Sequence, residues 1–389
     1  METQERSKML GTMEMGKLVP KVSIPIMISM MVQALYNVVD GIFVAKYSAA
    51  ALTAVSLAYP IQMLMIAVST GLGVGFNSLI SRKLGEKRAE EARDAAKNGM
   101  FTELCGYALF LVFGLLFAKP FFNLFTDDLE LQALGGEYLS IVCIFSFGLF
   151  FGICFERMMQ ATGNTVLSMV TQLTGAVINI ILDPIMIFGL LGCPAMGIAG
   201  AAIATVIGQI GGMTLGLVLN QAKNVELRLH LKGFRPNKTI LKGILDVGFP
   251  SIIMQSISSV MNVLMNMILL GFGAMAVNVL GVYFKLQSFV FMPVFGLSNG
   301  LVAILGYNYG ARMRARVYDA LKVALIWACV IMLLGTIAFL LIPETLLSLF
   351  EAGDARDLTD MGVVALRVIS LSFLLAAVGI TISTLFQAV

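Results

Sequence analysis

The chain has 389 residues, of which 58% are hydrophobic and only 13% are charged, with a formal net charge of +3. This composition is typical of a polytopic membrane protein and excludes an ordinary soluble globular domain. The single histidine and the five cysteines, which form no CxxC pair, support neither a zinc site nor a disulfide framework nor histidine-dependent catalysis. We therefore expect no enzymatic activity.

Ten apolar runs are each long enough to cross the hydrocarbon core of a bilayer, which takes about 20 residues. In chain order they cover residues 18–45, 53–80, 100–121, 131–155, 166–190, 197–219, 248–271, 277–305, 317–342 and 361–386. The predicted fold class is all-α, a polytopic bundle of membrane-spanning helices. Most of the 26 Lys and Arg residues fall on the side of the N-terminus, so the positive-inside rule predicts a multi-pass protein of the inner or plasma membrane with a cytoplasmic N-terminus.

An internal repeat joins residues that are all separated by the same distance along the sequence, which we call the repeat offset. The matching pairs are Pro25 and Pro250, Gln62 and Gln287, Gly71 and Gly296, Gly75 and Gly300, Gly85 and Gly310, and Asp94 and Asp319. Six helices precede the second copy, so both copies enter the membrane from the same side and form two pseudo-symmetric lobes related by an axis along the membrane normal. Glycines spaced four apart inside a span indicate close helix packing rather than a nucleotide loop.

The repeat also predicts the domain boundaries. Residues 1–220 form an N-lobe of six helices, the polar and basic segment 221–241 is a cytoplasmic linker, and residues 242–389 form a C-lobe with helices seven to ten. Because the second copy is shorter than the first by about two spanning helices, we expect this chain to lack helices eleven and twelve.

Two acidic residues lie inside predicted spans. Asp183 follows Asn179 by one helical turn and precedes Pro184, whose ring removes a backbone hydrogen bond, while Asp40 lies at a similar depth in the first helix. A carboxylate at membrane depth costs roughly 2.5–3.5 kcal/mol on insertion scales, and it usually marks an ion or substrate path. One interpretation is a buried polar contact that holds helices together; the second acid favours a functional site.

Other polar residues are candidates to line a cavity. They are Gln33, Tyr36, Asn37, Tyr138, Gln172, Gln209, Lys285 and Arg367, with Thr205 beside the two acids. For Lys285 and Arg367 the sequence leaves open whether they line the cavity or satisfy backbone carbonyls. Glu103, Glu156, Arg157 and Asp246 lie towards the ends of the apolar runs, where snorkelling and capping explain them.

These residues resemble a known family. Asn179-Ile-Ile-Leu-Asp183-Pro184-Ile-Met-Ile-Phe-Gly189 and the following 197–205 look like the fifth and sixth helices of multidrug and toxic compound extrusion (MATE) transporters, and Pro25 with Asp40 and Gly306-Tyr-Asn308-Tyr-Gly310 match as well. The resemblance covers essentially the whole chain. It implies a V-shaped, monomeric antiporter that exports small organic cations in exchange for H⁺ or Na⁺, with no cofactor and no nucleic-acid partner.

The resemblance also implies a site. Asp40, Asn179, Asp183 and Thr205 would bind the coupling proton or Na⁺ in the first lobe, with Tyr36 and Tyr138 as neighbours. Two features depart from the family pattern: no acid stands at mid-membrane in the seventh or tenth helix, and the family has twelve helices. The alternatives are a lipid-linked oligosaccharide flippase of similar architecture and a membrane receptor or scaffold that transports nothing.

Overall fold

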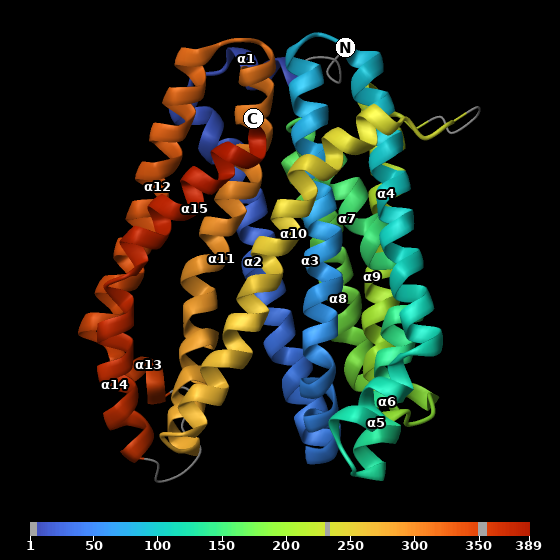
Figure 1. Ribbon diagram of the computed structural model, residues 1–389, viewed down its shortest axis with the longest axis vertical. Coiled ribbons are helices and arrows are strands. Elements are labelled where there is room, and N and C mark those ends of the chain that lie inside the picture. The colour runs from blue at the N-terminus through green and yellow to red at the C-terminus, as the bar shows by residue number, and fades with distance from the viewer. Residues whose placement is uncertain (1–5, 230–233, 349–355) are drawn as a thin grey trace.

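The computed structural model describes residues 6–229, 234–348 and 356–389, and within these residues the protein is helical without any β-strand. The helices of the first half are α1 (Arg6–Thr12), α2 (Met15–Tyr47), α3 (Ala49–Gly85), α4 (Ala89–Leu116), α5 (Ala118–Phe125), α6 (Leu129–Ile144), α7 (Phe147–Ala161), α8 (Thr165–Phe188), η1 (Leu190–Gly192), α9 (Gly197–Lys223) and η2 (Val225–Leu227). Those of the second half are α10 (Lys238–Leu270), α11 (Ala274–Gly310), α12 (Arg314–Leu341), α13 (Pro343–Ser348), α14 (Arg356–Ser370) and α15 (Phe373–Ala388). Figure 1 shows most of the long helices running along one common direction, with α10 crossing them obliquely.

Eight of the described helices are long and apolar enough to cross a membrane, and the number reaches ten if two bent pairs each count as one span. The pairs are α6 with α7, bent by 42°, and α14 with α15, bent by 47°. At each break a serine hydroxyl donates to the carbonyl three residues earlier, Ser146 to Cys143 at 2.8 Å and Ser372 to Ile369 at 2.7 Å. These bonds satisfy carbonyls that lose their helical partners at a kink.

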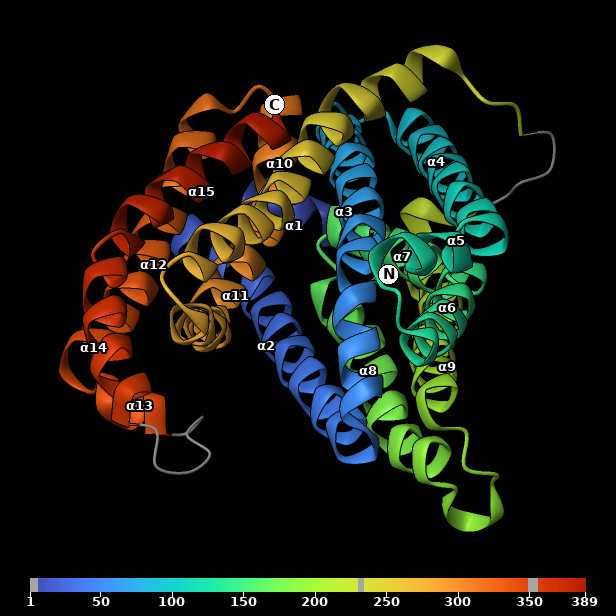
Figure 2. The ribbon, with the colours of Figure 1, turned by 60° about the horizontal axis from the view of Figure 1, so that its bottom comes forward.

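The repeat predicted from the sequence is present in the helix boundaries themselves. α3 and α11 begin and end at positions separated by the repeat offset, and so do α4 and α12. We call α2 to α7 the first copy and α10 to α15 the second copy. The helices form two lobes, one made by the first copy with α8 and α9 and the other by the second copy, with α2 running between them (Figure 2).

The copies exchange their first helices. α2 packs on α11, and α10 packs on α3, so each first helix lies against the second helix of the other copy. The repeated glycines make this exchange possible: a Cβ on Gly75 would meet the backbone of α10 at Ile244, and one on Gly300 would meet Ser23 of α2. Small residues therefore let backbones approach closely at both crossings.

A reciprocal crossing closes the end of the bundle that carries α1, which we call the α1 end. A Cβ on Gly85 would collide with the carbonyl of Tyr307, and one on Gly310 would collide with the carbonyl of Arg82. Gly85 of α3 thus packs against α11, and its counterpart Gly310 of α11 packs against α3. This reciprocal contact is what a pseudo-twofold axis between the two copies requires. The turns that follow match as well, because Lys87 (φ 61°) and Arg312 (φ 58°), which are also separated by the repeat offset, both adopt a left-handed backbone.

Salt bridges and hydrogen bonds then fasten the α1 end. Lys83 and Glu91 join α3 to the start of α4 at 2.7 Å, and at the equivalent place Arg316 of α12 donates to Asn308 of α11 at 2.9 Å. Arg316 also donates to the carbonyls of Leu10 and Met13, so the second copy holds α1 against the bundle.

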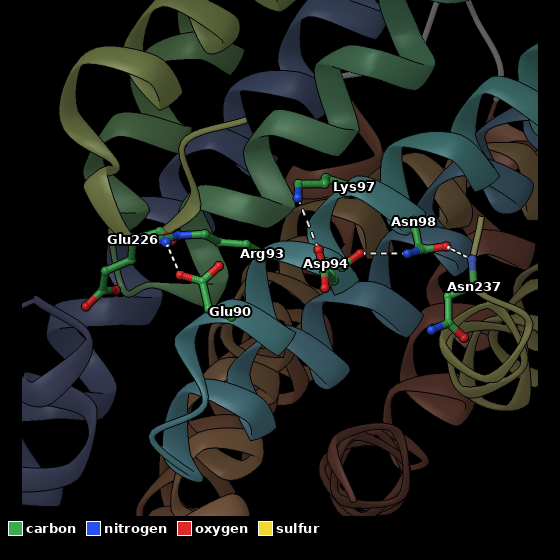
Figure 3. Close-up of polar contacts among 7 residues, drawn as sticks. All are labelled: Glu90, Arg93, Asp94, Lys97, Asn98, Glu226 and Asn237. Atoms are coloured by element: carbon green, nitrogen blue, oxygen red, sulfur yellow. Dashed lines mark hydrogen bonds and ion pairs between the residues drawn. The ribbon is translucent and has the colours of Figure 1, made fainter. Parts of the chain in front are cut away.

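The predicted linker lies against α4. In the structure α9 continues to Lys223 and α10 begins at Lys238, while residues 230–233 lie outside the described part. Arg93 of α4 donates to the carbonyl of Glu226 at 3.0 Å, and the backbone N–H of Asn237 donates to Asn98 at 2.9 Å, both visible in Figure 3. The linker is therefore anchored on the first copy at both of its ends.

Candidate functional site

A close crossing of α8 and α9 positions Asn179. A Cβ on Gly208 would lie 2.7 Å from the carbonyl of Gly175 and 3.1 Å from the Cβ of Asn179, so only glycine permits this approach. The consequence is that the amide of Asn179 reaches across to α9 and donates to Thr205 Oγ1 at 3.4 Å.

The two predicted acids meet in the same place. α2 packs on α8, and the carboxyl groups of Asp40 and Asp183 lie close enough to interact electrostatically. Two carboxylates this close repel each other, so a proton or another cation between them stabilises the pair. Asp183 is fully buried and also accepts from Asn179 Nδ2 at 3.1 Å. The structure thus brings together Asp40, Asn179, Asp183 and Thr205, from α2, α8 and α9.

Three oxygens of this cluster have no donor within the part of the chain that the structure describes. They are Asp40 Oδ1, Asn179 Oδ1 and Asp183 Oδ2, all buried. Carboxylate, amide and hydroxyl oxygens are the ligands of hard cations, so the donor set fits Na⁺ as well as a proton. No group of three or more His, Cys, Asp or Glu among the described residues could hold another kind of metal ion.

Tyrosines surround the pair. Tyr36 lies one turn before Asp40 on α2, and Tyr138 of α6 is close enough to Asp40 and Tyr36 to interact with them electrostatically. Gln62 of α3 donates to Tyr138 Oη at 2.9 Å, which connects α3 to the cluster. The sequence analysis did not select Gln62 as a site residue, although its position inside a span and its recurrence as Gln287 could have indicated it.

Some predicted residues lie elsewhere. Gln172 donates to Glu156 at 2.8 Å, two turns away from Asn179, and Gln209 buries its Oε1 without a donor among the described residues. Gln33 is half-buried and Asn37 is exposed on α2. Lys285 on α11 and Arg367 on α14 are exposed on helices of the second copy.

The expectation of snorkelling was wrong for three charged residues. Glu103 is fully buried, Arg157 is 6% exposed, and Glu156 is half-buried and bonded to Gln172. The apolar runs misled the prediction because the helices extend beyond them: α4 begins at Ala89, and α7 continues to Ala161. Asp246, in contrast, is exposed as expected.

Two lobes of spanning helices with a buried polar cluster in one of them define the class of membrane transporters. Comparison with known proteins agrees with this. The chain is 27% identical over 371 residues to the multidrug export protein MepA of Staphylococcus aureus strain MSSA476, a match that covers 94% of this chain and 80% of that protein. It is 26% identical over 367 residues to MepA of Staphylococcus haemolyticus strain JCSC1435, with the same coverage.

Solved structures give the same result. The fold matches the outward-facing conformation of a multidrug resistance MATE family transporter of the MOP superfamily, with a TM-score of 0.93, 27% identity and coverage of 99% of this chain and 85% of that one. It also matches a MOP superfamily transporter from Pyrococcus furiosus, with a TM-score of 0.92, 27% identity and coverage of 98% and 84%. The MatE family pattern matches residues 25–185 and 250–389, so this chain belongs to the MatE family.

Proposed function

We propose that the protein is a secondary active multidrug efflux antiporter that exports small organic cations in exchange for H⁺ or Na⁺. It has no enzymatic activity, lies in the plasma membrane and acts as a monomer, and the α1 end, with the N-terminus, faces the cytoplasm. Kinship with multidrug export proteins supports the transport of drugs, and the basic residues of the α1 end, such as Lys83 and Arg316, support the orientation.

One observation carries the coupling. Buried oxygens of Asp40, Asn179 and Asp183 lack donors, and Asn179 bonds to Asp183, so a proton or Na⁺ bound among these residues would satisfy them. A drug cation that approaches the same negative charge competes with that ion. Since linkage is reciprocal, each cation then weakens binding of the other, which is the requirement for exchange.

Two prolines provide places where the helices could bend when an ion binds. Pro25 lies inside α2 and Pro184 inside α8, and both helices pass through the cluster. A proline leaves one carbonyl without its helical partner and so lowers the cost of bending. We infer that ion binding between Asp40 and Asp183 changes the bend of one of these helices.

The test is efflux of a cationic dye from proteoliposomes under separately imposed pH and Na⁺ gradients. The parent should extrude dye under one gradient, whereas Asp40→Asn, which keeps the size of the side chain, should fold but neither couple nor show ion-dependent dye binding. Asp246→Asn, the same change at an exposed carboxylate of α10, is the matched control and should pump normally. Dye efflux by Asp40→Asn at the parental rate would contradict the proposal, as would binding of a lipid-linked pyrophosphate in place of the dye.

A further inference from the structure

A second buried polar cluster lies in the first lobe, apart from the site described above. Ser69 of α3 donates to Glu103 Oε2 of α4 at 2.9 Å, and Glu103 is 0% exposed. From α7, Arg157 and Cys154 lie close enough to Glu103 to interact with it electrostatically. Arg157 in turn donates to Gln160, and its stem packs on Gly73, where a Cβ would come within 2.9 Å of Arg157 Cγ.

The cluster is a polar layer parallel to the first one. Ser69 follows Gln62 by seven residues on α3, and Gln172, which donates to Glu156, precedes Asn179 by seven residues on α8. Two turns of helix rise about 10 Å. The second layer therefore lies about that distance from Gln62 on α3 and from Asn179 on α8, towards the α1 end.

The charges of the second layer do not balance when all its groups are ionised. It holds two carboxyls, Glu103 and Glu156, and one guanidinium, Arg157. Glu156 accepts a hydrogen bond from Gln172, whereas Glu103 Oε1 is buried with no donor among the described residues. Ser69 gives Glu103 a donor at one oxygen only, and burying a carboxylate whose other oxygen is unsatisfied is costly, so one bound proton on Glu103 balances the layer.

Packing does not require an acid at this position. In the second copy, at the repeat offset, Val294 takes the place of Ser69 and Ala328 the place of Glu103, and both are fully buried in the same apolar core. The repeated scaffold therefore tolerates apolar side chains here, and the polar pair of the first copy needs another explanation.

We propose that Glu103 is a second proton-binding site of this protein, in a layer about two helical turns from Gln62 and Asn179 on the side of the α1 end. It gives the first lobe two protonatable layers in series along α3 and α8. Its place in a proton path rests on the proposed antiport, while the binding of a proton by Glu103 does not.

Infrared difference spectroscopy tests proton binding without transport. The Asp40→Asn, Asp183→Asn double variant removes the first layer, and a carboxylic-acid C=O band should persist in it above pH 4.3, about where exposed glutamates ionise. Adding Glu103→Gln should abolish the band. Adding Glu137→Gln, at an exposed carboxylate of α6, should leave it unchanged.

The outcomes separate the possibilities. A band that is absent from the double variant, or that survives Glu103→Gln and disappears with Glu156→Gln, overturns the proposal. Ser69→Ala, which removes the donor to Glu103 and keeps the acid, should shift the band without abolishing it, so the test does not depend on one variant folding. In the otherwise unchanged protein, Glu103→Gln should retain dye binding and lose proton-driven efflux. Failure of Asp40→Asn to stop efflux would refute the antiport site and leave the infrared result standing.

Discussion

The two copies share a scaffold and differ in chemistry. The glycines that set the helix crossings recur at the repeat offset, and α3 and α4 have the same boundaries within their copy as α11 and α12. Three polar residues of the two clusters do not recur: the counterparts of Asp40, Glu103 and Tyr138 are Met265, Ala328 and Val363. Duplication therefore preserved the positions that fix backbone geometry, while Asp40 and Glu103 of the first copy have apolar counterparts in the second.

The largest effect on efflux is expected when Asp40 is replaced by the residue at the equivalent position of the second copy. Asp40→Met gives the first copy the residue that the second copy has and should abolish ion-coupled efflux. Met265→Asp in the same protein should not restore it, because α10 packs on α3 and so brings the new acid to neither Asn179 nor Asp183. Dye efflux under an imposed gradient measures both, and recovery in the double variant would show that the copies are chemically interchangeable.

The crossings should be sensitive to added volume, but unequally. A Cβ on Gly75 collides with the backbone of Ile244, whereas on Gly300 its nearest neighbour is Ser23 Oγ at 2.6 Å, which can rotate away. We expect Gly75→Ala to cost about 3 kcal/mol and Gly300→Ala about 1 kcal/mol. Thermal unfolding in detergent measures this. Gly281→Ala is the control, since a Cβ there meets nothing within 4 Å, and equal losses at both crossings would contradict the geometry.

The attachments of α1 to the two sides of the bundle should respond differently to pH. On one side, Arg316 of the second copy donates to the backbone of α1. On the other side, Ser7 of α1 donates to Glu226, whose carbonyl accepts a hydrogen bond from Arg93 of α4. Burial raises the pKa of Glu226 above its ordinary value of 4.5, against the opposing effects of Ser7, Lys8 and Arg93. The folded state therefore binds this proton more tightly, so its stabilising contribution is complete below pH 4.5 and is lost as pH rises through the raised pKa.

Glu226→Gln keeps the acceptor for Ser7 and removes the titration. It should flatten this part of the pH dependence and raise the midpoint of thermal unfolding by at most a few degrees at neutral pH. Hydrogen exchange of the α1 amides, followed across the same pH range, locates the effect. An unchanged pH profile in Glu226→Gln would assign the dependence to other groups.

The smallest effect is expected at the matching turns. Lys87 and Arg312 hold a left-handed backbone that costs a residue with a Cβ about 1 kcal/mol relative to glycine. Lys87→Gly and Arg312→Gly should each raise stability by up to that amount, and by similar amounts if the copies are equivalent here. Thermal unfolding of the two variants and of the parent measures both changes. A loss of stability would show that the cationic side chains stabilise the folded protein by more than the backbone strain costs.

The sequence predicted the repeat, the spans and the meeting of Asp40 with Asp183, because each depends on local pattern: constant spacing, apolar length and helical periodicity. The prediction for Glu103 was wrong. Glu103 was placed near the end of a helix because the helix was assumed to end where its apolar run ends. α4 extends further because Ala92, Ala95 and Asn98 bury a face against neighbouring helices. Such burial depends on contacts distant in sequence, which composition does not reveal.

The role of Gln62 was missed for a related reason. A glutamine in a span is ambiguous until its partner is known, and Tyr138 lies 76 residues further along the chain. The sequence also did not predict the exchange of first helices between the copies. The spaced glycines indicate close helix packing, but they do not identify the helix that packs on them.

The reciprocal crossing at Gly85 and Gly310 makes α3 and α11 long levers. Each helix has 37 residues and ends at that crossing, so its far end lies about 55 Å away. A rotation of about 10° at the crossing would displace the far ends by about 10 Å, an opening wide enough for a small organic molecule. The length of the two helices thus converts a rotation at one end of the bundle into a displacement large enough to matter at the opposite end.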